Sequence, residues 1–191
     1  LHRYNCHFRG AKGSGNEGGI RVPAVVRWPD GLPGEGSEIP DFVHMVDWFP
    51  TLLEMAGIAN DEESLPLDGQ SILPLLRGET PHQEPTRFWQ WNRFTPHGSC
   101  NAAVRDGDWK LVRPKISEAM AFPEQLKWWR TAMYYPEHFI ENGILQNAMP
   151  ERDIPPPPEP ELFNLAEDPL EKTNLANKHP ELTARLLCQL E

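Results

Sequence analysis

The fold prediction depends on residues 100–113, with the sequence CNAAVRDGDWKLVR. Two segments of six residues, 100–105 and 108–113, stand on either side of Asp106-Gly107, a dipeptide well suited to the two-residue turn of a β-hairpin. The stretch therefore predicts two antiparallel strands, at 100–105 and 108–113, joined by a turn at that dipeptide.

The segments around this hairpin extend the prediction to a small sheet with a helix on it. Residues 86–92 are aromatic and extended in character, and residues 161–165 form another short extended piece. Residues 180–191 predict a terminal helix with Pro180 in its first turn. Leucines recur at helical spacing on one face of that helix: Leu182, Leu186, Leu187 and Leu190. We therefore expect an antiparallel sheet covered by a C-terminal helix.

An insertion interrupts the sheet at residues 114–160. Helical pieces are predicted around Glu124–Ala132 and Glu137–Ile140. The run Pro155–Pro158 then predicts a stiff, extended spacer that leads back to the sheet.

The N-terminal part predicts a loop, a strand and helices. Residues 1–19 are rich in glycine and predict a loop, and the β-branched run at 20–28 predicts a strand. Residues 47–57 predict a helix with Asp47 as its N-cap and Gly57 as its stop. Residues 65–78 predict a turn at Asp68-Gly69 followed by a short helix.

Composition excludes several classes of protein. The chain has 191 residues, of which 39% are hydrophobic, so a packed core is expected. The formal net charge of −10 argues against a nucleic-acid partner, which would need a basic face. No stretch approaches the ~18 apolar residues of a membrane span. The three cysteines, Cys6, Cys100 and Cys188, have a spacing that fits no zinc site.

The clearest local feature for chemistry is residues 10–23, with the sequence GAKGSGNEGGIRVP. Lys12 stands on a glycine-rich loop, where backbone N–H groups can approach an anion and the ammonium adds a point charge. The spacing does not match the P-loop pattern. On the pattern alone, a surface loop with a solvated lysine is the favoured interpretation. Glu17 and Arg21 are expected to hold the loop together, through an internal ion pair or through backbone hydrogen bonds, and not to act on a substrate.

Several segments together resemble sulfatases, members of the alkaline phosphatase superfamily. The loop at 10–23 is similar to their lysine loop. Four later segments also agree in order: 47–57 (DWFPTLLEMAG), 67–76 (LDGQSILPLL), 103–112 (AVRDGDWKLV), and 161–165 (ELFNL) with its tail to residue 176. The resemblance covers the chain apart from residues 114–160.

The resemblance implies an α+β fold in two parts. Residues 1–80 would be the last part of the sulfatase α/β core, with the lysine loop, a strand and a helix. Residues 81–191 would be the C-terminal antiparallel sheet subdomain, with the helical insertion at 114–160 and the C-terminal helix packed on it.

The resemblance also implies chemistry. Sulfatases hydrolyse sulfate esters with a formylglycine made from Cys or Ser and with a calcium ion, and their loop lysine, Lys12 here, touches the sulfate. Neither Cys6 nor Cys100 is followed by the modification motif. The formylglycine and the calcium ligands are therefore expected upstream of Leu1, no metal ligand is assigned in this chain, and the chain alone is expected to be inactive.

The remaining expectations concern substrate, location and alternatives. Candidate substrate-binding residues are His7, Arg9, Trp91, Arg93 and His97. The partner would be a sulfated small molecule or sulfated carbohydrate, with no nucleic acid and no membrane, and the isolated chain could self-associate. A periplasmic or secreted location follows from the resemblance. Two alternatives stay open: a phosphate or phosphonate ester hydrolase of the same superfamily, and a non-catalytic binding or structural module.

Overall fold

The computed structural model describes residues 4–33, 36–59, 65–79, 84–92, 97–121, 134–142 and 153–191. The chain forms two compact units. The helical unit is Val22–Arg87, and the sheet unit combines Leu1–Arg21 with Phe88–Glu191. The N-terminal loop is part of the sheet unit.

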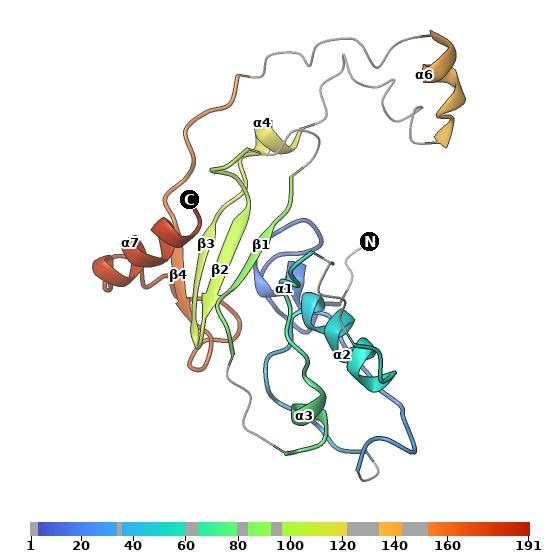
Figure 1. Cartoon of the computed structure of the whole chain (residues 1–191). Helices are drawn as coiled ribbons and strands as arrows, with labels where there is room; N and C mark the ends of the chain where they lie inside the picture. The colour runs from blue at the N-terminus through green and yellow to red at the C-terminus, as the bar shows by residue number, and fades with distance from the viewer. Residues whose placement is uncertain are drawn as a thin grey trace. The chain divides into compact units, whose positions relative to one another are not determined.

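The sheet unit is built on a four-stranded sheet in the order β1-β2-β3-β4 (Figure 1). The strands are β1 (Arg87–Gln90), β2 (Ala102–Asp106), β3 (Trp109–Arg113) and β4 (Glu161–Asn164). Strand β3 pairs antiparallel with β2 on one side and with β4 on the other. The predicted hairpin and the extended pieces on either side of it are therefore confirmed.

The hairpin turn lies one residue later than predicted. Asp106 pairs with Trp109, so Gly107 and Asp108 form the two-residue loop. Gly107 has φ +58°, a left-handed conformation that glycine adopts at little cost. Glycine is thus the first residue of the two-residue loop, the position at which the backbone adopts a positive φ.

Helix α7 (Pro180–Gln189) covers one face of the sheet, as predicted (Figure 1). Leu186 is fully buried against Val104, Leu111 and Leu162, one from each of the three strands β2, β3 and β4. Trp109, Leu182, Leu187 and Leu190 pack around this cluster. The leucine spacing of residues 182–190 therefore forms the apolar stripe that holds the helix on the sheet.

The N-terminal segment covers the opposite face of the sheet, and this covering buries a lysine. Lys110 of β3 is 0% exposed. Its Nζ lies 2.7 Å from Glu17 Oε1 and 3.0 Å from Glu171 Oε1. The backbone N–H of Glu17 donates to Glu171 Oε2 at 2.8 Å. We call Glu17, Lys110 and Glu171 the buried ion triad, which joins three distant parts of the chain.

Two predictions for the N-terminal part are wrong, and the first concerns helix α1 (Glu17–Ile20). The predicted loop ends early, at α1, and residues 21–28 are not in a strand. A strand needs a neighbour with which its backbone can pair, and the described residues provide none for this segment. Val22 and Val25 are 61% and 94% exposed.

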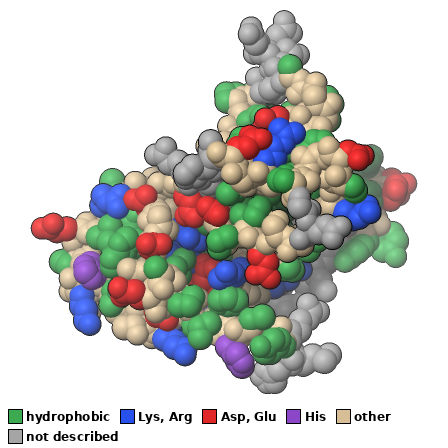
Figure 2. All heavy atoms as spheres, turned by 90° about the horizontal axis from the view of Figure 1, so that it is seen from below, with side chains coloured by type: hydrophobic (Ala, Val, Ile, Leu, Met, Phe, Trp, Pro, Cys, Tyr) green, Lys and Arg blue, Asp and Glu red, His purple; other side chains and the backbone are tan. Residues whose placement is uncertain are grey.

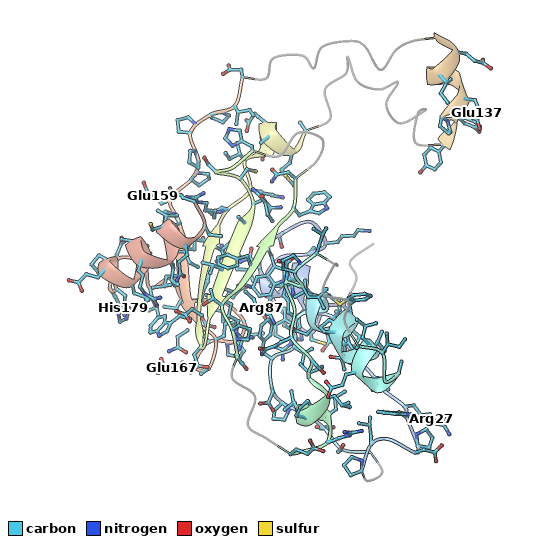
Figure 3. All side chains as sticks on the ribbon, in the orientation of Figure 1. Arg27, Arg87, Glu137, Glu159, Glu167 and His179 are labelled. Atoms are coloured by element: carbon cyan, nitrogen blue, oxygen red, sulfur yellow. The ribbon has the colours of Figure 1, made fainter. Side chains whose placement is uncertain are left out.

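The helical unit contains η1 (Met45–Asp47), α2 (Trp48–Met55) and α3 (Leu73–Leu76), which confirms the two predicted helices. Asp47 occupies the N-cap position of α2, as predicted, but its side chain makes no capping hydrogen bond to that helix. Instead it accepts from the Gln70 N–H at 3.0 Å and pairs with Arg87, labelled in Figure 3. Thr51 Oγ1 accepts from the Ile72 N–H at 3.0 Å. These bonds join residues 47–51 to residues 70–72.

The stop signals and the turn of the helical unit act as predicted. Gly57, after α2, and Gly78, after α3, have φ +68° and +69°. The N–H of Ile58 bonds to the Leu53 carbonyl, as in a Schellman motif. A Cβ at Gly69 would lie 2.0 Å from the Val46 carbonyl oxygen, so the turn at Asp68-Gly69 requires a glycine.

In the insertion, α4 (Ser117–Met120) follows the hairpin, and α6 (Glu137–Asn142) confirms the helix predicted at Glu137–Ile140. The piece predicted at Glu124–Ala132 lies outside the described residues. Residues 153–160 carry no helix or strand, consistent with the predicted proline spacer. Within the described parts of the chain, no helix has the length and apolar character that a membrane span requires. Acidic, basic and apolar side chains are interspersed on the face shown in Figure 2.

We predict that Lys110→Met destabilises the protein by about 3–5 kcal/mol, because two buried carboxylates lose their shared cation. Arg185→Met is the matched control, since Arg185 pairs with Asp106 at a similar 2.8 Å but its side chain is 51% exposed. The control should cost less than about 1 kcal/mol. Chemical denaturation of both variants measures the difference, and equal losses would contradict a structural role for the buried ion triad.

A second prediction concerns pH. Burial and then the charge of Arg87 lower the pKa of His44, and Asp47 opposes them. As pH falls below about 6.5, His44 therefore takes up a proton in the unfolded state before it does so in the folded state. The stability of the folded state that is present above that pH is progressively lost. The Val46 N–H donates to His44 Nδ1 at 3.3 Å. The substitution His44→Asn removes the titrating imidazole but keeps a side-chain acceptor for this N–H. The variant should show a weaker fall in denaturation midpoint between about pH 7.5 and 5.5; an unchanged fall would contradict the assignment.

Candidate functional site around Lys12

Lys12 stands at the tip of a tight loop, residues 10–14. Gly10 and Gly13 have φ +81° and +89°, so both bends use conformations that favour glycine. The backbone N–H and the hydroxyl of Ser14 both donate to the Ala11 carbonyl at 3.0 Å and close the loop. The loop therefore has a defined shape, which the pattern of glycines alone did not indicate.

Lys12 differs from the other cations of this segment in its contacts. Arg9 Nη2 lies 2.8 Å from Glu161 Oε1, and Arg21 Nη1 lies 3.8 Å from Glu17 Oε2, the ion pair predicted for this loop. The Lys12 side chain is exposed and forms no ion pair with any residue that the structure describes. Its ammonium is thus available to an anion from solution.

Helix α1 lies directly beneath the loop, at a distance that only glycine permits. The Gly18 N–H donates to the Arg9 carbonyl at 2.7 Å. A Cβ at Gly18 would lie 2.6 Å from the carbonyl oxygens of both Arg9 and Gly10, and one at Gly19 would lie 2.2 Å from that of Ser14. The two adjacent glycines thus let the first turn of α1 support the lysine loop.

The loop is also fixed to the edge of the sheet. The side-chain amide of Asn101 donates to the Gly13 carbonyl at 3.0 Å and to the Trp91 carbonyl at 2.6 Å. The indole of Trp91 lies 3.1 Å from the position that a Cβ of Gly13 would take. The structure therefore brings predicted site residue Trp91, which is 43% exposed, to the residue next to Lys12.

The other predicted substrate-binding residues lie in different settings. The guanidinium of Arg9 is already engaged, by Glu161 and by the Glu171 carbonyl, and stacks over Phe163 at 5.4 Å. His7 is exposed, edge-on to Tyr4. His97 is half-buried, and its carbonyl accepts from the Cys100 N–H. Arg93 lies outside the described residues. None of these contacts tests a role in substrate binding, which stays a prediction.

Sequence reasoning missed the residues that hold the loop in place: Lys110, Glu171 and Asn101. Lys110 was assigned only to a strand, although a charged residue between Trp109 and Leu111 of a predicted buried hairpin was a usable signal. Glu171 and Asn101 have φ +55° and +51°. Such values depend on tertiary contacts, so neither residue was recognisable from its neighbours in sequence.

Within the described ranges, no group of three or more His, Cys, Asp or Glu side chains is arranged to hold a metal ion. The buried carboxylates in this part of the chain belong to Glu17, Asp47 and Glu171, and each is paired with Lys110 or Arg87.

The sequence matches a protein family and is similar to curated relatives. Residues 12–120, more than half of the chain, match the family described as N-sulphoglucosamine sulphohydrolase, C-terminal. Rat steryl-sulfatase is 30% identical over 174 residues, covering 88% of this chain and 26% of that protein. Mouse arylsulfatase J is 25% identical over 194 residues, covering 97% of this chain and 31% of that protein.

Solved structures share the fold. A structure described in terms of glycosaminoglycan metabolism by Bacteroides thetaiotaomicron has a TM-score of 0.60 at 23% identity, covering 97% of this chain and 31% of that one. The structure of Ps i-CgsB has a TM-score of 0.62 at 23% identity, covering 96% and 31%. The chain belongs to the sulfatase family and corresponds to its C-terminal portion. It spans 26% and 31% of the length of the two curated relatives named above.

We predict that Gly19→Ala disrupts the lysine loop, because the added Cβ would lie 2.2 Å from the Ser14 carbonyl and 2.7 Å from that of Ala11. Gly98→Ala is the control, since a Cβ there meets nothing within 4 Å. Amide hydrogen exchange should be faster over residues 11–20 in Gly19→Ala only. Equal protection in the two variants would show that the close approach beneath the loop is not required.

Proposed function

We propose that this chain is the C-terminal part of a sulfuric ester hydrolase, in which Lys12 contacts the sulfate group. The observation that carries the proposal is the contrast around Lys12. Its loop is held by α1, by Asn101 and by the sheet, while its ammonium stays exposed and without an ion-pair partner among the described residues. A fixed backbone with an available cation favours binding of an anion in one position.

The chemical work assigned to Lys12 is electrostatic. Cleavage of a sulfate ester leaves negative charge on the sulfate oxygens and on the oxygen that departs. An ammonium already placed beside these atoms stabilises that charge without first reorganising. The lysine suits this role because it is a compact charge with three donors. Hydrogen bonds within the loop hold the backbone near Lys12. The flexible lysine side chain can therefore adjust the position of its ammonium to the sulfate.

The proposal assigns the attacking group and the calcium ion to other parts of the protein. Formylglycine would supply the nucleophile, and calcium would polarise the sulfate when bound. In the described part of this chain the buried acidic groups, Glu17, Asp47 and Glu171, are already paired with Lys110, Arg21 or Arg87. They do not fit a calcium site, and no step through the metal is assigned to residues of this chain.

The proposed partner is a sulfated small molecule or a sulfated carbohydrate. Trp91, beside the lysine loop, offers an exposed aromatic surface for the body of such a substrate, and His7, Arg9, Arg93 and His97 stay predicted contributors to the cleft. A periplasmic or secreted location and self-association of the isolated chain also stay predictions. The helical unit exposes large apolar side chains that would favour association: Val22, Val25, Met45, Phe49, Leu52 and Ile58.

The test is Lys12→Ala in the full-length protein that contains this chain. The variant should lower kcat/KM for a sulfate ester by roughly 10²–10³-fold, because one preorganised donor to the developing charge is removed. Its melting temperature should change little, since the Lys12 side chain is exposed. Lys172→Ala, which removes another exposed lysine, is the matched control and should retain activity.

Two results would contradict the proposal. One is an unchanged rate in Lys12→Ala, and the other is an equal loss in Lys12→Ala and Lys172→Ala. The isolated 191-residue chain, assayed in parallel, is expected to show no turnover.

A further inference from the structure

We propose that Asn101 is a positioning residue that holds Lys12 and Trp91 together as one two-part subsite for a sulfate group carried on a ring. This inference rests on the proposed function for its substrate. The contacts that carry it all lie within the sheet unit.

Asn101 is a buried polar residue with an unfavourable backbone conformation. It is 2% exposed and has φ +51°, a left-handed conformation that asparagine tolerates better than most residues. Its backbone carbonyl accepts from the Trp91 N–H at 3.2 Å, and its side-chain amide donates to the Trp91 carbonyl at 2.6 Å. One buried residue thus bonds both backbone groups of Trp91.

The same amide reaches the lysine loop. Its second bond goes to the carbonyl of Gly13, the residue that follows Lys12, at 3.0 Å. A side-chain amide nitrogen has two hydrogens, so these two carbonyls use its full donor capacity. The distance from the lysine loop to the strand end at Trp91 is therefore set by a single group.

Van der Waals contact reinforces this spacing. The Trp91 ring lies 3.1 Å from the position of a Cβ on Gly13, so the loop backbone rests against the indole and any side chain there would push the ring away. Gly13 also has φ +89°, which an L side chain rarely adopts. The loop and the indole can approach only because residue 13 is glycine.

The result is an exposed cation one residue from an exposed aromatic ring. Lys12 is exposed, and Trp91 is 43% exposed despite its contact with Gly13. An ammonium binds an anion, and an aromatic face packs against the apolar face of a ring. Together they match a sulfate ester of a cyclic alcohol better than that of a short open-chain alcohol.

The experiment is a double-mutant cycle in the full-length protein with Asn101→Gly, Trp91→Ala and the double variant. Asn101→Gly removes the amide but accepts the positive φ, so backbone strain does not enter the comparison. The substrates are cyclohexylmethyl sulfate and ethyl sulfate, which both release a primary alcohol and differ in the ring.

For the cyclic substrate, Asn101→Gly should lower kcat/KM about 10- to 100-fold through misplacement of Lys12. Trp91→Ala should raise KM about tenfold through loss of ring contact. The double variant should be no worse than the poorer single variant, because both changes break one unit. For ethyl sulfate, Trp91→Ala should have little effect. Additive losses, or equal effects of Trp91→Ala on both substrates, would overturn the inference.

A readout independent of activity separates this inference from the proposed function. Amide exchange over residues 11–15 should accelerate in Asn101→Gly while β2 and β3 keep their protection. Unchanged exchange over residues 11–15 would overturn the positioning role. If Asn101→Gly fails to fold, Asn101→Asp keeps the side-chain shape and replaces the donor with an acceptor, so it should give the same loop-specific acceleration. Absence of sulfate ester hydrolysis by the unmodified protein would instead overturn the function itself and the substrate part of the inference.

Discussion

The buried ion triad is the interaction on which the sheet unit depends. Lys110 is fully enclosed between the sheet and the N-terminal segment, and its charge is met by Glu17 at 2.7 Å and Glu171 at 3.0 Å. A buried ammonium without partners would cost several kcal/mol, so the three residues must come together for this face to close. Arg21, at 3.8 Å from Glu17, adds the second positive charge. The N-terminal segment, the hairpin and the tail after β4 are thereby locked into one arrangement.

This arrangement explains why the family segments occur together. The glycine pair at 18–19 and Glu17 belong to the lysine loop, whereas Lys110 belongs to the hairpin and Glu171 to the closing tail. In the helical unit, the segments at 47–57 and 67–76 are joined in a similar way by Asp47 and Thr51. Segments that are far apart in the sequence are thus joined in the structure by a small number of polar contacts. Glu17, Glu161 and Glu171 are paired with other cations, and Lys12 has no ion-pair partner among the residues that the structure describes.

Local patterns predicted the elements well where the determinants are local. The hairpin and the C-terminal helix follow from a Gly-containing turn and from leucines at helical spacing, so they were predicted and are confirmed. The prediction of a strand at 20–28 was wrong, because β-branched residues form a strand only when a neighbouring strand is present to pair with them. Asp47 does occupy the predicted N-cap position, but its carboxylate binds Arg87 and the Gln70 N–H, which are distant in sequence, and not the N–H groups of the helix. Propensity does not include such long-range partners.

The sequence by itself determined the order of the elements, the family to which the chain belongs, and the lysine at the centre of the candidate site. These depend on residue type and spacing, which the chain displays directly. Only the tertiary structure decided that the lysine loop packs on the sheet, that Lys110 is buried with two carboxylates, and that Asn101 joins Gly13 to Trp91. Each of these links residues separated by tens of positions. Their energies come from burial and hydrogen-bond geometry, which exist only once the chain has folded.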